Sequence, residues 1–147
     1  MAKKKSYAVI GLGRYGKAVA RELLQNGAEV LAVDADPEVV NAVAKTIPHC
    51  KCADVTKPGT VKQLGIADMD AVIVAIAGNL EASVMATMLC KEVGVKTVIA
   101  KCSDEMHRKI LKKVGADRVV FPEKESGVRL AKNILSAGFI DLVEQYV

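Results

Sequence analysis

The sequence predicts a single α/β domain built on a six-stranded parallel sheet. Six short apolar runs alternate with longer stretches that have helical spacing, and the connections between them are short. The run Asp70–Ala77 is apolar on both faces, as a strand covered by helices on both sides must be. A chain of 147 residues is long enough to bury the core of one such domain.

Each predicted strand is followed by a predicted helix. The strands are expected at Tyr7–Gly11, Glu29–Asp34, His49–Ala53, Ala71–Ile76, Thr97–Lys101 and Arg118–Phe121. The helices are expected at Tyr15–Asn26, Pro37–Thr46, Pro58–Leu64, Leu80–Val93, Glu105–Val114 and Glu125 to about Ala137. Asn79 and Asp104 are placed to cap the helices that follow them. Glycines stand where four helices should end, at positions 27, 94, 115 and 138.

Composition excludes several classes of protein. A content of 51% hydrophobic and 26% charged residues is typical of a globular chain rather than a disordered one. A net charge of +4, few aromatic residues and no helix-turn-helix or zinc-finger pattern predict no binding of nucleic acid. The apolar runs are too short to span a bilayer and no secretory signal opens the chain, so we expect a cytoplasmic protein. The cysteines lack paired spacing and are expected to be small buried residues: Cys50, Cys52, Cys90 and Cys102.

A glycine-rich loop gives the first indication of a ligand. The segment Gly11–Gly16 has the pattern G-x-G-x-x-G, follows a predicted strand and opens a predicted helix. In a Rossmann-like, doubly wound fold, Gly11 permits the turn, Gly13 lets a pyrophosphate approach the main chain, and Gly16 lets the helix pack near the sheet. The N–H groups that open the helix then face the anion. The residues predicted to bind a cofactor here are Gly11, Leu12, Gly13, Arg14, Tyr15 and Gly16.

An acidic residue follows at the expected distance. Asp34 ends the second predicted strand, near the spacing of about 20 residues that such folds show after the loop. Its carboxylate can accept hydrogen bonds from two ribose hydroxyls and would repel a 2′-phosphate, which favours NAD-type and adenosine ligands over NADP. Ala35, the next residue, is assigned to the same site. Asp36 is the competing acid, but Pro37 after it indicates a helix start.

Three more strand ends are expected at the same edge of the sheet. Asp54 can accept a hydrogen bond from the adenine amine with Val55 against the ring, or it can cap the short helix that follows. Lys101 ends the fifth strand, where it can contact a phosphate or an acidic neighbour, or simply be solvated. The end of the fourth strand borders the predicted crevice with Ala77, Gly78 and Asn79.

With these features in place, the chain resembles the KTN (TrkA-N type) domain, the nucleotide-binding half of RCK proteins that regulate potassium channels and Trk/Ktr-type transporters. The resemblance covers essentially the whole length of the chain. In particular, the chain is similar to the cytosolic ring subunit of Ktr systems. It rests on the segments Tyr7–Glu38, Cys52–Ile66, Asp70–Gly94 and Gly115–Ala131. It implies NAD, NADH, ATP or ADP as ligands, and a homodimer that assembles into a ring, expected to be an octamer. It also implies a membrane-embedded potassium transporter or channel subunit as partner.

The resemblance also implies roles for two charged residues. In such subunits the loop arginine, here Arg14, reaches the terminal phosphates of ATP and helps to distinguish ATP from ADP; an ordinary exposed helix-start arginine is the alternative. A cation at a helix N-terminus is unfavourable unless an anion compensates it. Glu123 matches the position where some Ktr subunits place a carboxylate near a divalent cation, for which Mg²⁺ or Ca²⁺ would suit. Its alternative role is a carboxylate stabilised by the start of a helix.

The end of the chain carries an apolar segment, Phe139–Val147, beyond the predicted domain of residues 1–138. We expect this segment to be a dimer interface, because the sheet is already covered; packing on its own domain is the alternative. Regulators of this kind usually carry a further C-terminal RCK lobe, which is expected to be absent from this chain.

Two classes of function compete. An NAD-dependent oxidoreductase would need an acid–base group and a substrate pocket, normally from a second domain. His49 opens a strand at the wrong edge of the sheet and His107 lies in a predicted helix, so both are expected to be structural or solvated. A redox-sensing repressor would need a DNA-reading element, which we do not find. The sequence therefore favours a non-catalytic regulatory subunit in which different nucleotides prefer different dimer geometries.

Overall fold

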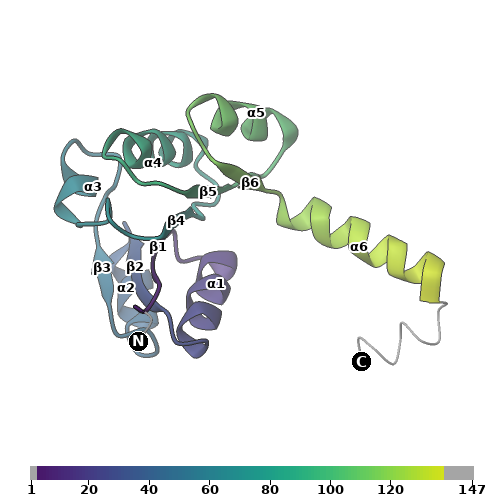
Figure 1. The fold of residues 1–147 in the computed structure, drawn as a ribbon, viewed down its shortest axis with the longest axis horizontal. Helices are drawn as coiled ribbons and strands as arrows, with labels where there is room; N and C mark the ends of the chain where they lie inside the picture. The colour runs from purple at the N-terminus through teal and green to yellow at the C-terminus, as the bar shows by residue number, and fades with distance from the viewer. Residues whose placement is uncertain (1–2, 138–147) are drawn as a thin grey trace.

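The computed structural model describes residues 3–137 as a parallel sheet with helices on both faces (Figure 1). The strands are β1 (Ser6–Ile10), β2 (Glu29–Asp34), β3 (Cys50–Cys52), β4 (Ala71–Val74), β5 (Val98–Lys101) and β6 (Arg118–Val120). The helices are α1 (Arg14–Gln25), α2 (Pro37–Val43), α3 (Thr60–Gln63), α4 (Leu80–Glu92), α5 (Glu105–Lys113) and α6 (Pro122–Ala137). All neighbouring strands pair in parallel, in the order β3-β2-β1-β4-β5-β6. This is the predicted Rossmann-like, doubly wound sheet.

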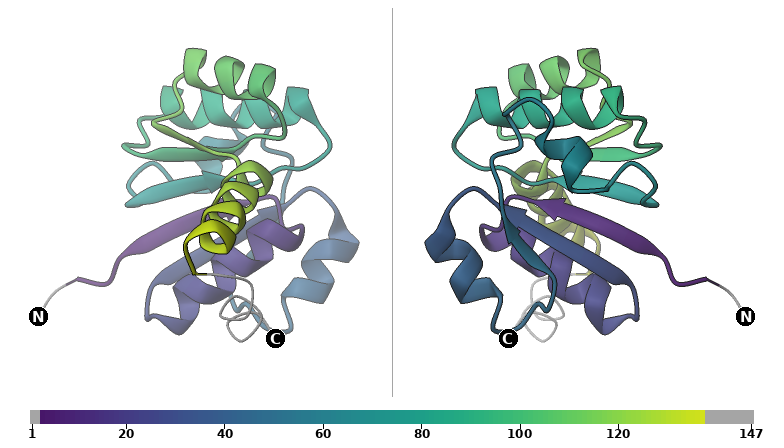
Figure 2. Two further views of the ribbon diagram at one scale, coloured as in Figure 1. Left: turned by 90° about the vertical axis from the view of Figure 1, so that its right-hand side faces the viewer. Right: turned by 90° about the vertical axis from the view of Figure 1, so that its left-hand side faces the viewer.

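The sheet lies between two layers of helices. Helices α1 and α2 cover one face, and α3, α4 and α5 cover the other (Figures 1 and 2). Successive residues of β1 enter opposite cores: Ala8 and Ile10 pack with one buried apolar cluster, and Val9 packs with the other. This burial on both faces explains why the strands are apolar without alternation.

The strand order reverses direction at β1. The chain builds outward from β1 through β2 to β3, and then returns to the other side of β1 with β4. The loops that follow β1 and β4 therefore leave the sheet in opposite directions, which opens a crevice at the carboxyl ends of these strands. The fold itself thus places a crevice beside the glycine loop.

Most predicted boundaries are close to the observed ones, and the predicted caps are confirmed. The Asn79 side chain accepts a hydrogen bond from the Ala82 N–H at 3.0 Å, and Asp104 accepts one from the His107 N–H at 2.7 Å. Helix α3 begins later than predicted, because Gly59 immediately before it has a φ of +83°. Helices α1, α4 and α5 end before glycines, as predicted. The fourth predicted stop, Gly138, lies outside the described residues.

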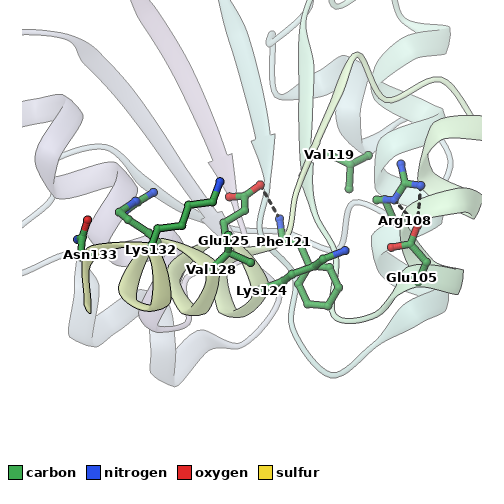
Figure 3. A pocket seen from close by; sticks show the side chains of 10 residues that line it. Glu105, Arg108, Val119, Phe121, Lys124, Glu125, Val128, Lys132 and Asn133 are labelled. Carbon is green, nitrogen blue, oxygen red and sulfur yellow. Dashed lines mark hydrogen bonds and ion pairs between the residues drawn. The ribbon is translucent and has the colours of Figure 1, made fainter. Parts of the chain in front are cut away.

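Helix α6 differs from the prediction in both position and direction. It begins at Pro122 rather than at Glu125, and it projects away from both layers instead of covering the sheet (Figure 1). Its apolar side chains are consequently exposed, from 42% for Ile134 to 86% for Leu135. A groove of about 560 Å³ lies between α5 and α6 (Figure 3). Because β6 is an edge strand and no described strand follows it, nothing in the described chain returns α6 to the sheet.

The predicted interface segment, Phe139–Val147, lies outside the described residues. Within the described residues, α6 carries exposed apolar side chains. None of the helices between residues 3 and 137 is long and apolar enough to cross a lipid bilayer.

The expectation that all four cysteines are buried is wrong for part of the set. Cys90 and Cys102 are buried, but Cys50 is half-buried and Cys52 is exposed. The reason is the position of β3, which forms an edge of the sheet with a neighbour on one side only.

Candidate functional site

A cleft of about 340 Å³ opens where β1, β2, β3 and β4 end. It brings together most of the predicted site residues: Gly11, Leu12, Gly13, Asp34, Ala35, Asp54, Val55, Ala77 and Asn79. We call it the main cleft. Gly16 does not line it, but lies beneath the loop. Segments far apart in the sequence are therefore assembled at one edge of the sheet, as predicted.

Two smaller hollows adjoin the main cleft. The first, of about 290 Å³, is called the Arg14 hollow and is lined by Gly13, Arg14, Tyr15, Ala75, Ala77, Lys101, Pro122 and Glu123. The second, of about 280 Å³, is called the His107 hollow and is lined by Ile76, Ala77, Gly78, Asn79, Leu80, Lys101, Cys102, Ser103 and His107. Apart from Gly16, the remaining predicted residues line one or both of these hollows: Arg14, Tyr15, Gly78, Lys101 and Glu123.

Two glycines of the loop are required by packing alone. A Cβ on Gly11 would lie 2.7 Å from the backbone of Ala75 and Ile76, and its φ of +97° is unfavourable for other residues. A Cβ on Gly16 would collide with the carbonyl oxygen of Gly11. These two residues let α1 start close against the ends of β1 and β4.

Gly13 has no such structural reason. A Cβ at this position would meet no atom within 4 Å, and the backbone has φ −72° and ψ −165°, which other residues also adopt. The residue is exposed and lines both the main cleft and the Arg14 hollow. The missing side chain leaves the space over the loop open, so there is room for a ligand to approach the backbone.

The start of α1 has the electrostatic character of an anion site. Helices α2, α4 and α5 each have a side-chain cap. The cap residue accepts a hydrogen bond from a backbone N–H in the first turn of the helix, and these caps are Asp36, Asn79 and Asp104 respectively. Helix α1, by contrast, has Gly13 at its N-cap, with no side-chain cap and no acidic residue in its first turn. Its first N–H groups and the positive end of its dipole are therefore available to an anion.

Asp34 has a structural role that the sequence reasoning missed. One carboxylate oxygen accepts the Leu12 N–H at 2.8 Å, and the other accepts the Asp36 N–H at 2.9 Å. The first bond ties the glycine loop to the end of β2. Because each carboxylate oxygen can accept more than one hydrogen bond, both oxygens can still receive ribose hydroxyls.

The helix-capping alternative for Asp54 is wrong. Its carboxylate accepts hydrogen bonds from the Thr56 hydroxyl at 2.6 Å and the Thr56 N–H at 3.0 Å, within the loop before α3. The hydroxyl bond, followed by the N–H bond, lowers the pKa of Asp54. The adenine contact stays a prediction. Val55 lines the main cleft but is only 4% exposed, so it offers a small apolar surface to a ring.

The Arg14 hollow gathers the charged residues of the site. Arg14 is exposed and makes no hydrogen bond or ion pair with any residue that the structure describes. The Lys101 ammonium lies 5.8 Å from the centre of the Tyr15 ring, a cation–π arrangement that the sequence reasoning did not anticipate. Glu123 lies in the first turn of α6. The structure therefore brings Arg14, Lys101 and Glu123 to one hollow from three different elements.

Within residues 3–137, no group of three or more metal-binding side chains is found. A cation at Glu123 would therefore need ligands from a nucleotide or from a second subunit. The role of Glu123 in binding Mg²⁺ or Ca²⁺ stays a prediction.

His107 is part of a buried hydrogen-bonded network. Its Nδ1 accepts the Ser103 N–H at 3.1 Å, so its Nε2 carries the proton and donates to the Ser83 hydroxyl at 3.0 Å. The Thr87 hydroxyl donates to the carbonyl of Ser83 at 2.9 Å. Burial lowers the pKa of His107, which favours the neutral ring. This geometry agrees with the structural role expected for His107, and His49 is exposed at the opposite edge of the sheet.

Comparison with known sequences adds a family and two relatives. Residues 7–122 match the TrkA-N domain. Ktr system potassium uptake protein C of Bacillus subtilis is 43% identical over 141 residues, which cover 96% of this chain and 64% of the relative. Ktr system potassium uptake protein A of Vibrio alginolyticus is 41% identical over 131 residues, which cover 89% of this chain and 60% of the relative. The chain thus spans less than two thirds of the length of these curated relatives.

Solved structures share the fold. The NAD(P)-binding domain of an exopolyphosphatase-related protein from Archaeoglobus fulgidus gives a TM-score of 0.78 at 23% identity, over 89% of this chain and 98% of that one. The GsuK channel bound to NAD gives 0.73 at 24% identity, over 91% of this chain and 24% of that one. GsuK bound to ADP gives a TM-score of 0.71 at 23% identity, over 92% of this chain and 35% of that one. At these identities the likeness establishes the fold alone.

Proposed function

This chain belongs to the TrkA-N domain family, and from that premise we propose that it is the nucleotide-binding part of a regulatory subunit of a potassium transport system. Its ligands in this proposal are adenosine nucleotides: ATP, ADP, NAD or NADH. Gly13 carries the proposal, because neither packing nor backbone conformation requires a glycine there and the space above it is open. The relatives named as Ktr potassium uptake proteins, and the GsuK structures with NAD and with ADP, support it.

The proposed ligand spans the main cleft from β3 to α1. Its ribose hydroxyls donate to Asp34, and its adenine lies toward Asp54 and Val55. Its α- and β-phosphates lie over Gly13 at the uncapped start of α1. Any terminal phosphate extends toward Arg14, whose guanidinium has no competing partner in the described chain.

The proposed action is regulatory rather than catalytic. Two nucleotides that prefer different arrangements of the subunits shift the balance between those arrangements by their difference in affinity. We propose a homodimer formed through the exposed apolar face of α6 and the groove beside it, which assembles into a ring of eight subunits. The ring acts on a membrane-embedded potassium transporter from the cytoplasmic side. A divalent cation, Mg²⁺ or Ca²⁺, held between Glu123 and the nucleotide phosphates, is a further part of this proposal.

The test is a pair of glycine variants. Gly13→Val should fold with an unchanged melting temperature, because its Cβ meets nothing, but its side chain occupies the space for the pyrophosphate. We expect its affinity for ATP, ADP and NAD to fall by about 10-fold or more, measured by isothermal titration calorimetry. Gly16→Ala is the contrasting variant: its Cβ collides with the Gly11 carbonyl, so its melting temperature should fall.

Two outcomes would refute the proposal. If Gly13→Val bound all these nucleotides as tightly as the unmodified protein, or if the unmodified protein bound none, no nucleotide would lie over this loop. Hydrolysis of nucleotide or oxidation of a substrate with NAD at enzyme-like rates would contradict the regulatory function and support the oxidoreductase alternative.

A further inference from the structure

Lys101 occupies a position shared by the two side hollows. It is the last residue of β5, and it lines both the Arg14 hollow and the His107 hollow. A ligand that extends beyond the main cleft must therefore pass to one side of this lysine or to the other.

The Tyr15 ring holds the Lys101 ammonium on one side. Tyr15 follows Arg14 in the first turn of α1 and lines the Arg14 hollow but not the His107 hollow. The ammonium lies 5.8 Å from the centre of its ring. This contact directs the positive charge of Lys101 toward Arg14.

Tyr15 lies beside the start of α6, because it lines the Arg14 hollow together with Pro122 and Glu123. Burial first, and then the carboxylate of Glu125, raise the pKa of Tyr15. The Glu125 carboxylate accepts the Phe121 N–H at 3.3 Å, which holds it at the base of α6 (Figure 3). The Tyr15 residue beside Lys101 is therefore half-buried, next to the first residues of α6, rather than free in solvent.

The two hollows differ in charge. The Arg14 hollow contains two cations, Arg14 and Lys101, and one carboxylate, Glu123. In the His107 hollow, Lys101 is the only lining residue with a charged side chain, because His107 is neutral as an acceptor from Ser103. A group with a terminal phosphate is stabilised in the first hollow. The His107 hollow has no anionic lining residue that could pair with an uncharged or cationic group such as an oxidised nicotinamide.

We propose that Lys101, oriented by Tyr15, is a specificity-determining residue that favours nucleotides with a terminal phosphate chain over dinucleotides. This inference rests on the proposed nucleotide site. ATP directs its terminal phosphates between Lys101 and Arg14, whereas NAD must extend its second nucleoside past Lys101 into the His107 hollow. Loss of the ammonium therefore weakens the binding of ATP and leaves the affinity for NAD unchanged or slightly higher.

The test is titration calorimetry of Lys101→Met with ATP, ADP and NAD at one fixed salt concentration. Methionine keeps most of the apolar stem and removes the charge. The dissociation constant for ATP should rise by roughly 5- to 50-fold, that for ADP by less, and that for NAD should stay within about twofold. Lys101→Arg should restore the preference for ATP.

Tyr15 gives a second variant that leaves the charge in place. Tyr15→Leu removes the ring under the ammonium and should lower the ratio of ATP to NAD affinity, whereas Tyr15→Phe should keep it. Lys113→Met, on the exposed face of α5, is the matched control and should change neither affinity.

The outcomes separate this inference from the function on which it rests. If Lys101→Met and Tyr15→Leu bind ADP but show an unchanged ratio of ATP to NAD affinity, Lys101 does not determine specificity. If the unmodified protein binds none of the three nucleotides, the proposed site is wrong, and this inference falls with it. Should Lys101→Met not fold, the comparison of Tyr15→Leu with Tyr15→Phe decides the question.

Discussion

The Asp34 carboxylate joins the loop after β1 to the end of β2, because it accepts the N–H groups of Leu12 and Asp36. The same carboxylate is the proposed acceptor for the ribose. A substitution here therefore affects both the geometry of the loop and the binding of any nucleotide. These two effects can be separated, because asparagine keeps one acceptor oxygen and alanine keeps none.

We predict that Asp34→Ala and Asp34→Asn both lose affinity for ATP, ADP and NAD by a similar factor, roughly 10- to 100-fold, since the adenosine ribose is common to all three. Calorimetry measures the affinities, and thermal unfolding measures the loop contribution. The melting temperature should fall more for alanine than for asparagine.

Asp68→Asn, which alters an exposed aspartate outside the site, should change neither the nucleotide affinities nor the melting temperature. Unchanged nucleotide binding in both Asp34 variants would show that the carboxylate serves the loop alone.

At the scale of the elements, α4 and α5 are joined by the His107 network. The His107 residue is 5% exposed, and its Nδ1 must accept a hydrogen bond from the Ser103 N–H. A protonated imidazole has donors on both nitrogens and would face that N–H with another donor. Protonation should therefore loosen the contact between these helices.

This gives a prediction for the pH dependence of stability. Burial lowers the pKa of His107 below its ordinary value of 6.5. The unfolded chain then binds a proton before the folded protein does, so the contribution of the neutral ring is complete above about pH 6.5 and is lost as the pH falls below it.

The free energy of unfolding, from urea titrations between pH 5 and 8, should decline by at most about 1.4 kcal/mol per pH unit from this group. In His107→Asn, this contribution to the pH dependence of the free energy of unfolding should be absent. His49→Asn, which changes the other and exposed histidine, should retain it. Equal slopes in the two variants would contradict a neutral buried His107.

Helix α6 shows the limit of element prediction. Its existence follows from its sequence, but its direction does not, because periodicity shows which residues share a face and not what that face meets. The same holds for Cys52: its residue type predicts burial, and its place on an edge strand exposes it.

For the whole molecule, the proposed site and the proposed interface are neighbours. Pro122 and Glu123, the first residues of α6, line the Arg14 hollow, while the far end of the same helix exposes Leu135. A ligand in the Arg14 hollow would therefore touch the base of the helix through which we propose that subunits associate. This continuity offers a short physical route from nucleotide to subunit arrangement.

We predict that Leu135→Asp disrupts self-association without unfolding the domain, because the side chain is 86% exposed in the single chain and makes no core contact. Light scattering coupled to size-exclusion chromatography should show a shift to the monomer mass. Ser136→Asp, which adds the same charge at the next exposed position of α6, should leave the mass unchanged. Identical masses for both variants would remove α6 from the interface.

The sequence by itself determined the strands and helices, the parallel sheet, the glycine loop and the acid after β2, because apolar periodicity and glycine spacing are local properties. Only the tertiary structure decided that Asp34 accepts the Leu12 N–H, that Lys101 lies over the Tyr15 ring, and where α6 points. These depend on which residues from distant segments meet at the carboxyl edge of the sheet. Contacts of that kind are set by packing in three dimensions, and no local pattern encodes them.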